Sequence, residues 1–376
     1  MDALLSPPGL TDPALAGGRL TIDLGALAEN WRQVGARVRV AETAAVVKAD
    51  AYGIGIAPAG SALAAAGCRT FFVALPEEGQ RLRAAAPGVT IYVLAGLLPG
   101  TSQALAAADL RPVLNSWGEI EEWAAFRETG AATGCAVHVD TGMNRLGLSL
   151  HEALELARRP DLLAAIAPNL LMSHLVVSEE AANPLNRRQL TLFREIAAQF
   201  PEIPASLANS AGIYLDEDFH FDLVRPGIAL YGASPGPGVP VPMQTVVTAE
   251  ARVLMVREAE AGETVGYGAT ERLRRPSRIA ILSAGYADGY HRVTGSSDER
   301  KGAHVVIRNR PARILGRVSM DLIAVDVTDI RAASRGDWAE LFGPNVKVDE
   351  VAGHARTVGY EFLTQLGRRY ERIYRG

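Results

Sequence analysis

The residue with the clearest chemical potential is Lys48, which ends the apolar run Ala44–Val47. An ammonium group at the end of a buried strand is costly without a partner, whereas a partly desolvated lysine can form a Schiff base or accept a proton. Lysine is rare in this chain: the only others are Lys301 and Lys347, and both lie among polar residues. Lys48 is therefore the main candidate for an amine nucleophile. The structural alternative is a rim lysine paired with Asp50 or another carboxylate.

The elements that would place Lys48 alternate along the first part of the chain. From Leu20 to about Gly232, short apolar runs typical of strands are separated by segments typical of helices. The strand-like runs are Ala44–Val47, Thr70–Leu75, Thr90–Ala95, Arg111–Leu114, Ala136–Val139, Asn169–Leu175, Ala205–Ala208 and Leu223–Tyr231. The helix-like segments include Pro58–Ala66, Glu77–Ala86, Trp117–Thr129, His151–Arg159 and Asn186–Phe200. This α/β order predicts a parallel sheet, and eight repeats favour a closed (β/α)8 barrel of the TIM type.

The sequence pattern changes after Tyr231. Residues 232–242 are rich in proline and glycine, as in a linker between domains. Beyond them, β-branched runs bounded by turn residues are Thr245–Ala249, Arg278–Leu282, His304–Arg308 and Leu322–Val327. We therefore expect two domains, a barrel over residues 1–236 and a mostly β domain over residues 237–376.

Polar residues follow the strand-like runs at the edge where the catalytic groups of barrels gather. They are Arg145 after the fifth run, His174 at the end of the sixth, Ser210 after the seventh, and Arg225, Gly227 and Ile228 in the eighth. Taken singly, His174 could be a core histidine and Arg225 an ion-paired stabiliser. The loops after strands seven and eight are a common phosphate site, and Ser210 with the amides after Arg225 suits one. A lysine, an arginine and a phosphate cradle at one edge indicate pyridoxal 5'-phosphate.

Composition excludes several other classes. The net charge is −4 and the isoelectric point is near 6.0, which argues against a nucleic-acid or anionic-membrane partner. Only Cys68 and Cys135 are cysteines, and no His/Cys cluster has metal-ligand spacing, so we expect neither a disulfide scaffold nor a metal. We expect no signal peptide before Arg19, and the apolar run Leu162–Val177 contains too many polar residues to span a membrane. We expect a cytoplasmic protein.

Seven motifs resemble those of alanine racemases, in the same order from Leu20 to Tyr374. They are VVKADAYG (46–53), DTGMNRLG (140–147), ANSA (208–211), VRPGIALYG (224–232), GYGAT (266–270), GYADGY (285–290) and GRVSMD (316–321). The resemblance implies a barrel that carries pyridoxal 5'-phosphate, a β domain that contributes to the partner's active site, and a head-to-tail homodimer. It also implies interconversion of L- and D-alanine by two-base proton transfer through an aldimine, supplying D-alanine for peptidoglycan.

The resemblance assigns roles by position. Lys48 resembles the lysine that carries the cofactor and acts as one base, and Tyr267 the opposing base from the other subunit. Arg145 and the backbone at Met320 resemble the groups that hold the substrate carboxylate. The phosphate shell corresponds to Tyr52, Ser210, Gly227, Ile228 and Tyr360. Arg225 resembles the arginine that faces the pyridine nitrogen, with His174 beside it.

Two positions depart from the family pattern. His138 stands where the family usually has a carbamylated lysine, and Ile54 stands where histidine is common. A neutral imidazole at His138 can accept a hydrogen bond from Arg145 but brings no negative charge. The alternatives left open are a broad-specificity or serine racemase, a decarboxylase of the same fold, and a pyridoxal phosphate carrier without activity. The decarboxylases use a cysteine from the second domain, and the carriers have no second domain.

Overall fold

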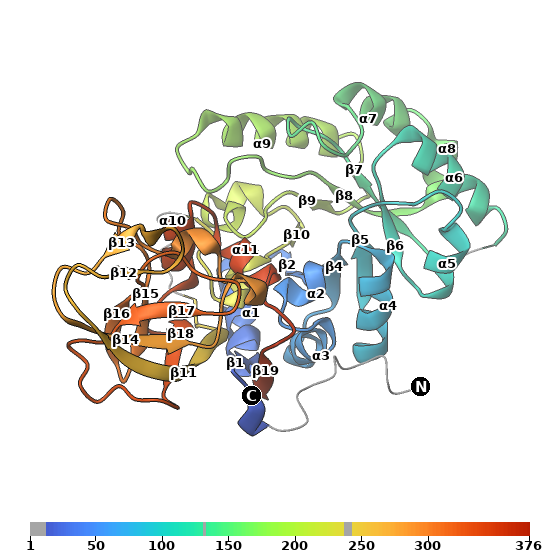
Figure 1. Cartoon of the computed structure of the whole chain (residues 1–376). Helices are drawn as coiled ribbons and strands as arrows, with labels where there is room; N and C mark the ends of the chain where they lie inside the picture. The colour runs from blue at the N-terminus through green and yellow to red at the C-terminus, as the bar shows by residue number, and fades with distance from the viewer. Residues whose placement is uncertain (1–12, 131–132, 237–242) are drawn as a thin grey trace. The chain divides into compact units, whose positions relative to one another are not determined.

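The computed structural model describes residues 13–130, 133–236 and 243–376. The chain forms two compact units (Figure 1). We call residues 27–230 with 234–243 the barrel unit. The other, which we call the β unit, holds residues 231–233, residues 244–376 and the N-terminal residues up to Ala26. The expected domain boundary at 236/237 and most of the expected linker lie outside the described residues.

The barrel unit contains a seven-stranded parallel sheet in sequential order. Its strands are β3 (Ala45–Val46), β4 (Thr70–Val73), β5 (Thr90–Val93), β6 (Arg111–Leu114), β7 (Cys135–His138), β8 (Pro168–Met172) and β9 (Ala205–Ser206). The short strands β10 (Leu223–Val224) and β2 (Glu42–Thr43) pair in parallel and close the circle. The Arg225 amide donates to Ala208 O on one side, while the Val46 amide donates to Pro226 O on the other. Seven of the eight predicted strand runs are confirmed, because a run that is buried on both faces is apolar throughout. The eighth, Leu223–Tyr231, is a strand only at Leu223–Val224, and Ile228–Tyr231 form a 3-10 helix.

Helices alternate with these strands along the chain (Figure 1). The helices are α1 (Leu24–Val38), α2 (Lys48–Tyr52), α3 (Ile56–Ala66), α4 (Pro76–Ala85), α5 (Ser102–Ala107), α6 (Trp117–Arg127), α7 (Leu150–Ala157), α8 (Pro160–Ile166) and α9 (Pro184–Ala197). Their caps are local: the Ser116 and Ser149 hydroxyls accept the amides of Glu119 and Glu152 at the starts of α6 and α7. None of the described helices is long and apolar enough to cross a membrane.

The β unit is built on a mostly antiparallel sheet. Its strands are β1 (Gly18–Asp23), β11 (Val247–Ala259), β14 (Ser277–Leu282), β15 (His304–Ile307), β16 (Arg310–Arg313), β17 (Ile323–Asp326), β18 (Trp338–Phe342) and β19 (Glu371–Arg375). The hairpin of β12 (Thr264–Val265) and β13 (Glu271–Arg272) and the helices α10 (Val348–Ala355) and α11 (Gly359–Thr364) complete it. The four predicted β-branched runs are confirmed as β11, β14, β15 and β17.

One expected boundary is wrong. We placed the N-terminal residues with the barrel, but β1 pairs antiparallel with β11 and parallel with β19 in the β unit. The reason lies in the strand's alternating burial, which fits a sheet covered on one face and not a doubly buried barrel strand.

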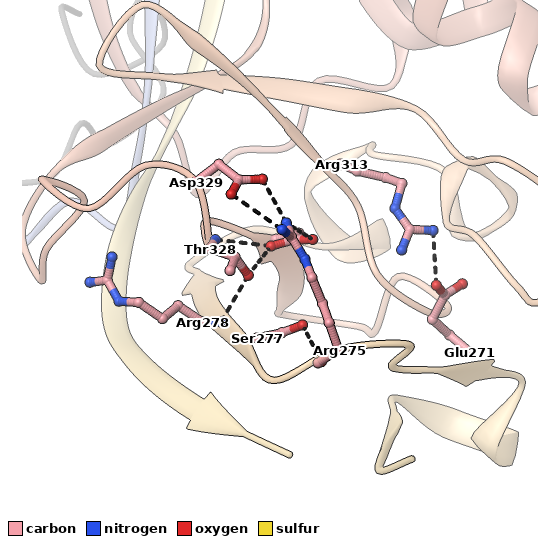
Figure 2. Close-up of polar contacts among 8 residues, drawn as sticks. Glu271, Arg275, Ser277, Arg278, Arg313, Thr328 and Asp329 are labelled. Atoms are coloured by element: carbon pink, nitrogen blue, oxygen red, sulfur yellow. Dashed lines mark hydrogen bonds and ion pairs between the residues drawn. The ribbon is translucent and has the colours of Figure 1, made fainter. Parts of the chain in front are cut away.

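Figure 2 shows two ion pairs of the β unit, one between two loops and one between two strands. Arg275 pairs with Asp329 at 2.6 Å, and Arg313 pairs with Glu271 at 2.8 Å. The Arg275–Asp329 pair is exposed, whereas Glu271 in the other pair is only 3% exposed. The Glu271 carboxylate also accepts the Ser296 hydroxyl at 2.7 Å. This pair therefore fixes strand β13, which follows the turn that carries Tyr267.

Candidate active site

Lys48 begins a turn of left-handed helix at the carboxyl end of β3. Residues 49–52 all have φ between 51° and 54°, a conformation that non-glycine residues rarely adopt and that costs about 1–2 kcal/mol each. The Glu78 carboxylate stabilises the turn by accepting the Ala49 and Asp50 amides at 2.6 and 3.3 Å, and its other oxygen accepts two amides at the end of β4. Backbone strain of this kind clusters at functional sites.

The Lys48 amine makes no hydrogen bond or ion pair with any described residue. The alternative of a structural pair with Asp50 is wrong, because that carboxylate binds Arg81 at 2.9 Å and the Ile56 amide at 3.0 Å. Although Lys48 keeps contact with solvent, the surrounding protein partly desolvates the amine and so lowers its pKa. The positive charge of Arg145 lowers the pKa of Lys48 further, and Glu78 opposes both effects.

At the expected phosphate site, the loops that carry Ser210 and Gly227 pack against the turn that begins at Lys48. The Ser210 hydroxyl oxygen accepts the Gly227 amide at 2.8 Å and the Ala229 amide at 3.4 Å. A Cβ on Gly227 would lie 2.4 Å from the Tyr52 hydroxyl, so a larger residue would collide with it. Amides, two hydroxyls and a bare glycine face one another here, which is the composition of an anion cradle.

Arg225 is a buried guanidinium with only neutral acceptors around it in the described residues. It donates to the Ser206 hydroxyl and to the carbonyls of Ser173 and Leu207. The expectation that it could be an ion-paired stabiliser is therefore wrong. Burial lowers its pKa to about 9, so it stays protonated at neutral pH and keeps an uncompensated positive charge inside the barrel.

Two histidines lie near this charge. Burial and then Arg225 lower the pKa of His174 to about 3, and the same two causes lower the pKa of His138 to about 4. Both imidazoles are therefore neutral at pH 7. His138 Nδ1 pairs with Asn115 Oδ1 at 2.8 Å, a partner that no sequence motif indicates.

Arg145 lies on a loop whose conformation is fixed by hydrogen bonds inside the loop. The Asp140 carboxylate accepts the amides of Gly142, Met143 and Asn144 at 2.7–2.8 Å. The Asp140 amide also pairs with Leu148 O at 2.8 Å, which closes the loop. Arg145 is exposed and has no hydrogen bond or ion pair among the described residues, so its guanidinium is available to an anion. The hydrogen bond that His138 could accept from Arg145 is not formed, and His138 pairs with Asn115 instead.

Three expected site residues, Tyr267, Met320 and Tyr360, belong to the β unit. Tyr267 lies on a 3-10 turn between two glycines with φ of 78° and is 64% exposed. The turn packs against the segment that leads to Met320, since a Cβ on Gly316 would lie 2.4 Å from Val265 O. Met320 is 52% and Tyr360 40% exposed.

Comparison with known proteins identifies the family. The model of the alanine racemase N-terminal domain matches residues 22–235, and that of the alanine racemase C-terminal domain matches residues 246–374. The chain belongs to the alanine racemase family. An alanine racemase of Rhizobium meliloti strain 1021 is 49% identical over 369 residues, which are 96% of this chain and 97% of that protein. A biosynthetic alanine racemase of Agrobacterium fabrum strain C58 is 50% identical over 95% of this chain and 93% of its own.

A solved alanine racemase structure agrees with the fold. The crystal structure of the enzyme from Bartonella henselae, with covalently bound pyridoxal phosphate, has a TM-score of 0.90 and 42% identity, covering 96% of this chain and 100% of that one. Racemase relatives match both parts of the chain, so the resemblance read from the motifs is confirmed.

Sequence reasoning missed the residues that support this racemase site. Glu78, Asn115 and Ser206 contact the Lys48 turn, His138 and Arg225, respectively. Glu78 reads as an ordinary acidic residue in the first turn of α4, where acids are common. The position of Asn115 and Ser206 could have identified them as site residues, because they lie at the carboxyl ends of β6 and β9.

Proposed function

We propose that this chain interconverts L- and D-alanine with pyridoxal 5'-phosphate as cofactor and supplies D-alanine for peptidoglycan. The observation that carries the proposal is the barrel edge itself. An amine with no partner among the described residues, a buried uncompensated arginine and an amide-lined cradle all lie at the carboxyl ends of its strands. The biosynthetic alanine racemase of Agrobacterium fabrum is 50% identical to this chain and the catabolic one of the same strain 43%, which supports the biosynthetic role.

The residues present fit the cofactor. Ser210, Tyr52 and the amides of Gly227 and Ile228 would hold its phosphate, together with Tyr360, because the hydroxyls and amides lie together beside a glycine that excludes a side chain. The Gly227 amide, which here donates to the Ser210 hydroxyl, would donate to the phosphate instead. Lys48 would bind its aldehyde carbon, since its amine has no competing ion pair. Arg225 and the neutral His174 would face its ring, Arg225 as a donor that cannot accept a proton.

When bound, the cofactor withdraws electron density from the substrate and makes its α-proton acidic. Racemisation then needs a base on each face of the α-carbon. Lys48 would take or return the proton on one face, which requires a neutral amine, and its lowered pKa makes that form more accessible. Tyr267 would serve the other face. A free tyrosine has a pKa near 10, so its anion costs about 4 kcal/mol at pH 7 unless cations such as Arg145 and Arg225 compensate.

The loop that follows β7 and carries Arg145 would bind the substrate. Arg145 would hold the substrate carboxylate in a bidentate contact, aided by the backbone at Met320. Asp140 pre-organises the loop, so little entropy is lost when the substrate binds. The neutral His138–Asn115 pair adds no negative charge beside Arg145, which leaves its full charge for the carboxylate.

We further propose a homodimer in which the β unit of one chain serves the barrel of the other. The exposed apolar side chains of the β unit support this, since Tyr267, Tyr286 and Met320 are 64%, 41% and 52% exposed. Large exposed apolar groups on one unit are typical of an interaction surface.

The test is turnover of a panel of L-amino acids, followed by circular dichroism. We expect the ellipticity of L-alanine to decay to zero, with that of L-serine decaying far more slowly. Equal rates for both would identify a broad-specificity racemase. Release of carbon dioxide without racemisation would identify a decarboxylase, and no change in any substrate would identify a carrier.

A further inference from the structure

The side chain of Gln189, on helix α9, is 2% exposed and fully engaged in hydrogen bonds. Its Nε2 donates to His174 O at 2.9 Å and to Thr141 Oγ1 at 3.0 Å. Its Oε1 accepts the Val176 amide at 2.9 Å. One amide group thus binds the carbonyl and the amide on either side of Leu175.

This pattern is that of a residue in a parallel strand. In a parallel ladder, each paired residue donates to the carbonyl before its partner and accepts from the amide after it. Strand β8 ends at Met172, and the Ser173 amide makes a backbone bond to Ser206 O on β9. Beyond that point Gln189 takes the place of a neighbouring strand, so its two hydrogen bonds fix the backbone of residues 174–176.

The same segment is held from the barrel interior. Arg225 donates to Ser173 O, and the Ser173 hydroxyl pairs with Thr141 Oγ1 at 2.8 Å. Because Thr141 also accepts from Gln189, a continuous chain of hydrogen bonds joins α9 to the buried guanidinium. A displacement of Gln189 would therefore reach both His174 and Arg225.

We propose that Gln189 is a positioning residue of the racemase: its amide fixes residues 173–176 and thereby aims His174 and Arg225 at the cofactor. This inference rests on the proposed function. The same helix offers a matched control, Asn186, which is also 2% exposed and donates to the carbonyls of Val177 and Glu180, beyond the His174 segment.

The experiment compares the holoenzymes of Gln189→Met and Asn186→Leu. Each substitution nearly conserves side-chain volume and removes buried hydrogen bonds, so we expect both to lower the unfolding midpoint. Only Gln189→Met should lower kcat by about tenfold with KM changed less than about threefold, because geometry at the reacting centre is lost and substrate binding is kept. It should also change the visible circular dichroism of the bound cofactor, which reports how the ring is held.

A second variant covers the case in which Gln189→Met does not fold. Gln189→Glu keeps the acceptor for the Val176 amide and loses the donor to His174 O, so its kcat should fall below that of the unaltered protein and its cofactor dichroism should change. If the folded Gln189 variants match Asn186→Leu in kcat and dichroism, Gln189 is a structural residue and the inference is wrong. Absence of alanine racemisation in the unaltered protein would instead overturn the proposed function.

Discussion

At the residue scale, the environment of Lys48 differs from that of an ordinary surface lysine. A strained left-handed turn presents it, Glu78 offsets part of the strain through two amide contacts, and Asp50 is engaged elsewhere. A lysine whose pKa is lowered by desolvation and by a nearby arginine is a better nucleophile at neutral pH than a solvated one.

We therefore predict that Lys48 carries the cofactor. Borohydride reduction of the holoenzyme followed by peptide mapping should place the pyridoxyl group on Lys48, because its amine has no competing partner among the described residues. Lys301 and Lys347 serve as internal controls and should stay unlabelled. Label on either of them would contradict the assignment.

His138 gives a prediction about bicarbonate. Histidine does not form the stable carbamate that a lysine forms, and this histidine is hydrogen-bonded to Asn115. Racemase activity should therefore be unchanged in degassed buffer with or without added bicarbonate. Activity that falls on degassing and returns with bicarbonate would show that another group is carbamylated.

His138 also makes stability depend on pH. Its pKa is about 4 in the folded chain against about 6.5 when unfolded, so the unfolded state binds more protons below pH 6.5. The contribution of neutral His138 to the unfolding free energy is fully present above pH 6.5. It is lost, by about 3 kcal/mol, as the pH drops through 4. Urea unfolding at pH 7.5 and pH 4.5 should show a smaller loss for His138→Gln than for the unaltered protein. Substitution of the exposed His151 should not change the loss.

At the element scale, the sequence predicted the strands better than the supports of the site. Runs that are apolar on both faces belong to barrel strands, and residues at their carboxyl ends, such as Arg145 and Ser210, could be placed at one edge from the pattern alone. The left-handed turn of α2 could not be predicted, because alanine, which stands at 49 and 51, rarely adopts positive φ. Gln189 and Glu78 were missed since a polar residue on a helix usually faces solvent.

The loop elements of the β unit give a further prediction. Glu271 holds strand β13, four residues after Tyr267, through Arg313 (Figure 2) and also through the Ser296 hydroxyl. Glu271→Ala removes a buried carboxylate and leaves the Ser296 hydroxyl without its acceptor. Arg313 is half exposed and regains water, so we expect a loss of about 2 kcal/mol in unfolding free energy. The loss of kcat should be larger than that of cofactor affinity, since Tyr267 is displaced and Lys48 is not.

A matched control lies in the same figure. Asp329→Ala removes the Arg275 pair, whose side chains are 51% and 66% exposed, and such surface pairs contribute at most about 1 kcal/mol. Its unfolding free energy and kcat should stay close to those of the unaltered protein. Equal effects of the two substitutions would show that burial of Glu271 does not matter for the Tyr267 turn.

At the scale of the whole molecule, the two proposed bases lie in different compact units. Lys48 belongs to the barrel unit and Tyr267 to the β unit, where its side chain is largely exposed. In a head-to-tail dimer, the β unit of each chain would complete the barrel of the other, and two equivalent sites would form. Each site would then need residues from both chains.

We predict that two inactive variants restore activity when mixed. Lys48→Ala and Tyr267→Ala should each abolish racemisation as pure dimers, because every site then lacks one base. In a mixed dimer, one site lacks both bases and the other keeps an intact lysine and an intact tyrosine. Equal mixing with free exchange makes about half of the dimers mixed, so about a quarter of all sites should recover. Decay of L-alanine ellipticity after mixing measures this recovery, with each variant alone as control. If native mass spectrometry shows subunit exchange and no activity returns, Lys48 and Tyr267 act within one chain.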